Sequence, residues 1–156
     1  MRTSTGFLGA LPDDHQARLK AVAKDVGFPS GTRIFEEGEP ADRFWVIRTG
    51  AVTLDMKVPG HRLLSQVPIA IESVGPGQLL GWSWLFPPYV CRLGAETVSP
   101  VRALEFDAET VRVLCDEDHR LGHALTLSVA QIIGHRLQAS RVRLLDTCAP
   151  PTAAPR

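Results

Sequence analysis

Small and basic residues near the middle of the chain could together bind an anion. Gly81 and Ser83 offer backbone N–H donors, and Arg92 offers a cation a short distance later. A partly buried anion needs both kinds of partner, because an unpaired charge removed from water costs several kcal/mol. Two indoles, Trp82 and Trp84, flank the serine and would supply an apolar wall. The segment is therefore a candidate binding site for a small ligand.

The stretch that must position these residues runs from residue 75 to residue 98 and reads GPGQLLGWSWLFPPYVCRLGAETV. Three glycines near its start favour tight bends, where the backbone passes close to another group. A bulky apolar run follows, and two prolines end it before the chain returns as a strand that carries Gly94 and Ala95. This order predicts the floor of a pocket.

The same order resembles the phosphate-binding cassette of the cyclic-nucleotide-binding domain family, which is the sensor fold of the catabolite-activator class of bacterial regulators. The resemblance covers roughly residues 11 to 145. In the family, a ligand at the cassette shifts the helices that follow it. The expected ligand-binding residues are Gly81, Ser83, Arg92, Gly94 and Ala95 of the cassette, together with Trp82 and Trp84, against which we expect an apolar or weakly polar effector to lie.

The cassette departs from the family pattern where the nucleotide is gripped. The family has a glutamate for the ribose hydroxyl directly after a glycine, whereas Trp82 follows Gly81 here. The family also has an arginine, then serine or threonine, then alanine. When Ala95 is aligned with that alanine, Gly94 takes the serine position and Arg92 falls one residue out of register. In a strand, such a slip turns the side chain to the opposite face, so we expect an altered ligand preference.

The composition is that of an ordinary globular chain with one main domain. The sequence has 156 residues, 44% of them apolar, with 17 basic and 17 acidic side chains. This balance gives no overall field that would favour nucleic acid or an anionic membrane. Three cysteines without a CxxC pair argue against a disulfide framework, and no apolar run is long enough to span a bilayer. We expect a cytoplasmic protein.

Short β-like runs alternate with turn residues between residues 28 and 107. The phrase GTRIFEEGEPADRFWVIRTGAVTL also resembles the first hairpins of the family. The sequence therefore predicts a mainly β fold, an antiparallel β-roll or double-stranded jelly roll. A helix over about residues 12 to 27 should precede the roll, since Pro12 and two aspartates favour a helix start and an apolar stripe runs to Gly27.

The expected organisation has three parts. A flexible arm covers residues 1–10, the domain covers residues 11–145, and a disordered tail rich in proline and alanine covers residues 146–156. Transcription factors of the family carry a helix-turn-helix domain after the long helix, and about ten residues are too few for one. We therefore expect no direct sequence-specific DNA binding.

The longest helical pattern spans residues 119–145, after a shorter helix that Asp107 should cap. One apolar face of the long helix begins with Leu121 and Leu125, and a second contains Val129. Two faces predict two partners, the roll and the same helix of a second copy, and hence a homodimer. The dipole of the helix C-terminus accounts for three basic residues, Arg136, Arg141 and Arg143.

These patterns favour a non-catalytic regulatory module. No catalytic motif is found, and His119 and His123 are two possible metal ligands without a third, so we expect no enzyme activity and no metal. The main hypothesis is a sensor whose degenerate cassette binds a small effector other than cAMP and signals to a partner through the dimer helix. Two alternatives stay open: a protein-interaction module with a filled pocket, and a genuine cAMP or cGMP regulator. No cofactor is expected apart from such an effector.

Overall fold

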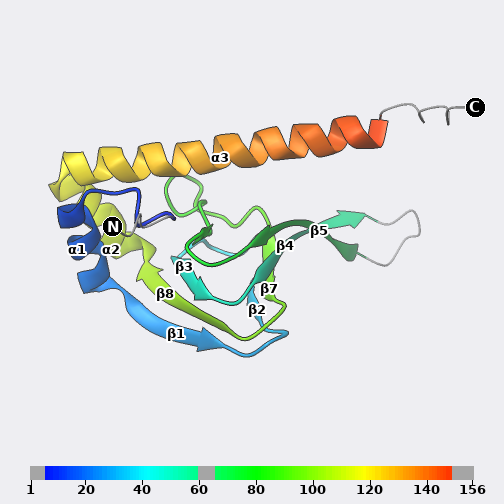
Figure 1. Ribbon diagram of the computed structural model, residues 1–156, viewed down its shortest axis with the longest axis horizontal. Coiled ribbons are helices and arrows are strands. Elements are labelled where there is room, and N and C mark those ends of the chain that lie inside the picture. The colour runs from blue at the N-terminus through cyan, green and yellow to red at the C-terminus, as the bar shows by residue number, and fades with distance from the viewer. Residues whose placement is uncertain (1–5, 60–65, 149–156) are drawn as a thin grey trace, which may run out of the picture.

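Two four-stranded antiparallel sheets form a β-roll in the computed structural model, which describes residues 6–59 and 66–148 (Figure 1). The first sheet has the order β1-β8-β3-β6, with β1 (Lys24–Phe28), β3 (Arg43–Thr49), β6 (Leu79–Leu80) and β8 (Val101–Asp107). The second has the order β2-β7-β4-β5, with β2 (Arg33–Phe35), β4 (Val52–Pro59), β5 (Gln66–Val74) and β7 (Gly94–Thr97). The predicted fold class is confirmed.

Three helices flank the roll: α1 (Asp13–Val22), α2 (Ala108–Glu117) and α3 (His119–Cys148). The N-terminal helix is shorter than expected, because Val26 belongs to β1 and pairs with Ala103 of β8. Asp107 caps α2 as expected, since its side chain accepts a hydrogen bond from the Thr110 N–H at 2.9 Å. Among the described helices, none is long and apolar enough to cross a membrane.

Both ends of the described chain differ from the arm and tail that the sequence suggested. Phe7 and Leu8 are buried in the core, and the Phe7 N–H donates to the Gly77 carbonyl at 2.8 Å. Residues 6–10 are therefore part of the packed domain, while residues 1–5 lie outside the described residues. At the other end α3 continues to Cys148, and the remainder of the expected tail also lies outside the described residues.

The centre of the first sheet is buried on both faces, because four consecutive residues of β3, Phe44 to Ile47, are buried. Trp45 and Ile47 point into the roll, where they join the apolar cluster between the two sheets. Phe44 and Val46 point the other way and join a second cluster that includes residues of the N-terminal segment and all three helices. Helices and roll therefore share one wall, and this wall is the first sheet.

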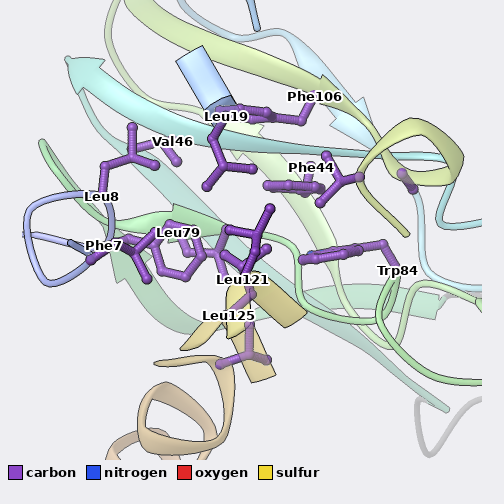
Figure 2. Packing of buried hydrophobic residues seen from close by; sticks show 14 of the residues in the cluster. Phe7, Leu8, Leu19, Phe44, Val46, Leu79, Trp84, Phe106, Leu121 and Leu125 are labelled. Atoms are coloured by element: carbon purple, nitrogen blue, oxygen red, sulfur yellow. The ribbon is translucent and has the colours of Figure 1, made fainter. Parts of the chain in front are cut away.

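We call this second cluster, between the first sheet and the helices, the helix-side core. An aromatic stack occupies its centre (Figure 2). The Phe44 ring lies between Trp84, at a centroid distance of 4.1 Å, and Phe106, at 4.8 Å. Trp84 comes from the glycine-rich segment, whereas the two phenylalanines come from strands of the first sheet. The stack therefore fastens this segment to the core that the helices also cover.

The two ends of α3 have different surroundings. Leu121, Leu125 and Val129 are buried against the roll, although the sequence suggested two separate faces for them. Beyond Val129 the described part of α3 has no fully buried side chain, and the helix continues past the helix-side core over β5 (Figure 1). Apolar packing therefore holds the first half of α3 and other contacts must hold the second.

A matched pair of valines on α2 tests the helix-side core. Val111 is fully buried and Val113 is 47% exposed, and both replacements by alanine bring the same gain in helix propensity. We expect Val111→Ala to lower the free energy of unfolding by about 2 kcal/mol and Val113→Ala to change it by less than about 0.5 kcal/mol. Urea denaturation followed by circular dichroism measures both values, and equal effects would contradict the assignment of this face.

Candidate ligand-binding site

The glycine-rich segment bends directly after β6. Gly81 has a φ of +90°, in the left-handed region that favours glycine, and an added Cβ would lie 3.6 Å from the Cβ of Phe44. The bend turns the chain from the first sheet into a loop that begins with Trp82 and Ser83. Because the bend is packed against β3, the start of this loop has a fixed position relative to the sheet.

A single arginine on α2 anchors the rest of the loop. Trp84 is fully buried, and its carbonyl accepts a hydrogen bond from Nη1 of Arg112 at 2.7 Å. The same guanidinium lies over the Tyr89 ring, with its carbon 4.3 Å from the ring centroid. Helix α2 therefore holds both the middle and the end of the loop.

A small cavity of about 30 Å³ lies where this loop meets the roll and α3. Among the residues that the structure describes, five of the seven expected site residues line this cavity: Gly81, Trp82, Ser83, Trp84 and Arg92. The remaining described lining residues are Phe35, Ala41, Arg43, Leu54, Cys91, Leu93 and Arg136. The structure therefore brings the glycine bend, both indoles and the arginine to one hollow.

The register argument for Arg92 does not apply. That argument assumed an extended strand, in which neighbouring side chains point to opposite faces. In the structure β7 begins only at Gly94, and Arg92 and Leu93 lie in the bend before it. Both residues line the cavity, and Arg92 is exposed, despite the one-residue offset.

The other two expected site residues, Gly94 and Ala95, are not among the described residues that line the cavity. Ala95 is fully buried between the sheets, opposite Leu54 of β4. Gly94 lies opposite Asp55, on the other face of the sheet, where Arg33 and Asp55 form an ion pair directly against its Cα. Hydrogen bonds to Asp55, and then to Glu36, raise the pKa of the Arg33 guanidinium. Gly94 thus leaves room for an ion pair.

The cavity presents cations and no carboxylate among its described lining residues. Arg43 has a weak partner, with its Nη1 3.7 Å from Glu105. For Arg92, no carboxylate of residues 6–59 or 66–148 lies within salt-bridge distance. Because guanidinium groups bind oxyanions through paired hydrogen bonds, such a site favours a negatively charged ligand.

Two further polar groups of the lining are uncharged. The Trp84 indole N–H is buried and has no hydrogen-bond partner among the described residues. The Cys91 thiol also lines the cavity, and burial, followed by the charges of Glu39 and Asp42, raises its pKa to about 11. The thiol is therefore neutral near pH 7, and the part of the chain that the structure describes contains no cluster able to hold a metal ion.

Arg136 is the lining residue whose role the sequence did not indicate. It was explained by the dipole at the end of α3, but it lies about three turns before that end. Its Nε is 3.2 Å from a Glu72 carboxylate oxygen, and its Nη2 donates to the Leu79 carbonyl at 2.9 Å. Burial lowers its pKa, and the charge of Glu72 opposes this. Its spacing from Leu125 and Val129, on the side of α3 that faces the roll, could have indicated this position.

A model of the cyclic nucleotide-binding domain family matches residues 25–118, more than half of the chain. The chain belongs to the cyclic nucleotide-binding domain family. The resemblance that the glycine-rich segment suggested is therefore confirmed, and we call the small cavity lined by the segment after β6 the cassette cavity.

Known proteins similar to this cyclic nucleotide-binding domain include regulators. A CRP-like cAMP-activated global transcriptional regulator of Mycobacterium tuberculosis is 27% identical over 140 residues. The match covers 90% of this chain and 58% of the regulator, so the chain spans less than two thirds of its curated relative.

Solved structures show the same fold. A cyclic nucleotide-binding domain from Methylobacillus flagellatus aligns with a TM-score of 0.78 at 17% identity, over 92% of this chain and 78% of that one. The N-terminal domain of a transcriptional regulator from Streptomyces coelicolor aligns with a TM-score of 0.68 at 25% identity, over 88% and 93% of the two chains.

Restoring the serine of the family pattern at position 94 should harm this domain. An added Cβ would collide with the Arg33 guanidinium and lie 2.5 Å from Oδ1 of Asp55, so the ion pair would have to move. We expect Gly94→Ser to lower the free energy of unfolding by about 1 to 3 kcal/mol. Gly134→Ser is the control, because nothing lies within 4 Å of a Cβ there. Unchanged stability of Gly94→Ser in urea denaturation would show that the pair does not need this space.

Proposed function

We propose that this cyclic nucleotide-binding domain is a non-catalytic regulatory module that binds a small effector other than cAMP and signals through α3. The observation that carries the proposal is the cavity of about 30 Å³ at the cassette. Typical small-molecule sites measure about 300–1,000 Å³, so a nucleotide would require a large opening of the loop. Trp82 contributes to this small size, since its side chain lines the cavity.

The chemistry of the lining supports the same proposal. A ribose hydroxyl needs an acceptor, and the family pattern provides a glutamate where this chain has Trp82. The described lining has guanidinium groups but no carboxylate. The cassette thus keeps the half of the site that suits an anion and lacks the half that suits the sugar.

The exposed side of α3 supports a homodimer. Leu127 is 50% exposed and Leu145 is 69% exposed, and they lie about five full turns apart on one side of the helix. Leu137 and Leu144 add exposed apolar surface near the end of α3. A helix with buried leucines on one side and exposed leucines on another suits a second copy of itself.

A specific observation also favours the interaction module as a second candidate. Phe86 is 40% exposed beside the cassette and stacks on Trp82 at a centroid distance of 5.5 Å. This apolar pair could contact a partner protein, with Trp82 serving to fill the pocket rather than to bind an effector.

Tryptophan fluorescence separates these candidates, because two indoles line the cavity. We expect no saturable response to cAMP or cGMP up to about 1 mM, and a saturable response to at least one compound of a metabolite panel. Arg92→Ala should weaken that response about tenfold, whereas Arg102→Ala, an exposed arginine on β8, should not change it. Micromolar binding of a cyclic nucleotide would contradict the proposal, and a flat response to every compound would favour the interaction module.

The dimer has its own test on α3. Leu145→Glu should weaken self-association at least tenfold, because a charge would enter an apolar interface. Val113→Glu, which changes an exposed apolar residue on α2, should leave it unchanged. Sedimentation equilibrium measures the association constant, and a wild-type chain that is monomeric at about 100 μM would rule out a functional homodimer.

A further inference from the structure

Polar contacts attach the second half of α3 to the roll. Arg136 contacts the Glu72 carboxylate at 3.2 Å and the Leu79 carbonyl at 2.9 Å. About two turns of helix further on, Arg143 donates to the Ile71 carbonyl and lies 3.9 Å from the other oxygen of Glu72. Two arginines of α3 therefore share one carboxylate of β5.

Hollows surround this attachment. A hollow of about 180 Å³ between β5 and α3 shares Trp82, Leu93 and Arg136 with the cassette cavity. Another of about 350 Å³ also reaches Arg136, together with Glu72 and Leu79. Side chains thus do not fill the space between this half of α3 and the sheet. A helix with few buried apolar contacts is easier to displace than one packed along its length.

The cassette cavity offers donors to a ligand at the same place. Arg92, just before β7, and Arg136, on α3, both line it. The buried Trp84 N–H has no hydrogen-bond partner among the described residues. Its volume of about 30 Å³ exceeds the roughly 10–15 Å³ that one water requires. The space therefore fits a group of a few atoms that accepts hydrogen bonds from cations.

We propose that the cavity binds a compact oxyanion, and that the bound anion competes with Glu72 for Arg136. This oxyanion proposal rests on the proposed function and specifies the chemical class of its effector. A guanidinium binds an oxyanion through a planar pair of N–H groups, so a ligand in the cavity offers Arg136 the same kind of partner as Glu72. When Arg136 turns toward the anion, the shared contact between α3 and β5 weakens, and the second half of α3 is released.

Titration of the full chain with inorganic phosphate, sulfate, acetate and chloride at equal ionic strength tests the ligand class. Tryptophan fluorescence should saturate with at least one of the three oxyanions and not with chloride. Arg136→Gln should weaken this binding about tenfold and Arg136→Lys should restore part of it, because the charge returns without the planar fork. Arg141→Gln, on an exposed position of the same helix, is the matched control.

Glu72→Gln tests the competition itself. Removal of the competing carboxylate should tighten oxyanion binding several-fold, whereas a purely structural role for Glu72 would leave binding equal or weaker. Hydrogen exchange of backbone amides gives the second readout. Binding of the oxyanion should speed exchange in α3 beyond residue 133, and Glu72→Gln should do so without any ligand.

The outcomes separate this proposal from the function on which it rests. Equal affinities of the wild type and of both the Glu72 and Arg136 variants would overturn the competition, as would the absence of any saturable oxyanion effect up to about 50 mM. A metabolite that binds without a negative charge would leave the proposed sensor intact and exclude the oxyanion. Micromolar binding of cAMP would instead overturn the proposed function.

Discussion

Burial of β3 on both faces of the first sheet is the constraint on which the rest of the structure depends. Phe44 and Trp45, neighbours on β3, belong to different cores, one under the helices and one inside the roll. The cassette loop is fastened to the first of these by the stack of Trp84 on Phe44. Because protein interiors are close-packed, a displacement of this loop cannot leave the helix-side core unchanged. The loop and the helices therefore share one packed core, and Arg112 of α2 holds the same loop by a hydrogen bond to the Trp84 carbonyl.

The same constraint explains why the cassette cavity is small. With Trp84 placed in the core and Trp82 at the wall, the loop contributes bulk where a nucleotide site needs room. The two guanidinium groups avoid most of the cost of burying a charge, because Arg92 is exposed and Arg136 has Glu72 as a counter-charge. A carboxylate in the apolar lining would need comparable compensation. The lack of a carboxylate among the described lining residues is thus consistent with their packing.

The sequence predicted the features that depend on local pattern. Short β-like runs such as Phe44 to Ile47, separated by glycine turns, were enough to predict the antiparallel roll. Val26 was wrongly placed at the end of the first helix, because apolar residues at this spacing suit a helix end and a strand equally. The side of Arg92 depended on where β7 begins, a boundary that pattern alone does not set. The role of Gly94 depends on Arg33 and Asp55, which come from two other strands of the sheet.

The two halves of α3 are attached to the roll differently, the first by apolar packing and the second by Arg136 and Arg143, and this difference has a mechanical consequence. At about 1.5 Å per residue, the helix extends roughly 18 Å from Arg136 to Cys148, so a small rotation at Arg136 becomes a larger displacement at the exposed end. Leucines such as Leu125 hold the first half in a dry core and provide the fixed point. A helix packed by apolar contacts throughout could be released only by exposing them to water. An ion pair differs, because Arg136 can exchange Glu72 for another anion without exposing apolar surface to water, and we therefore propose the second half of α3 as the part that a ligand moves.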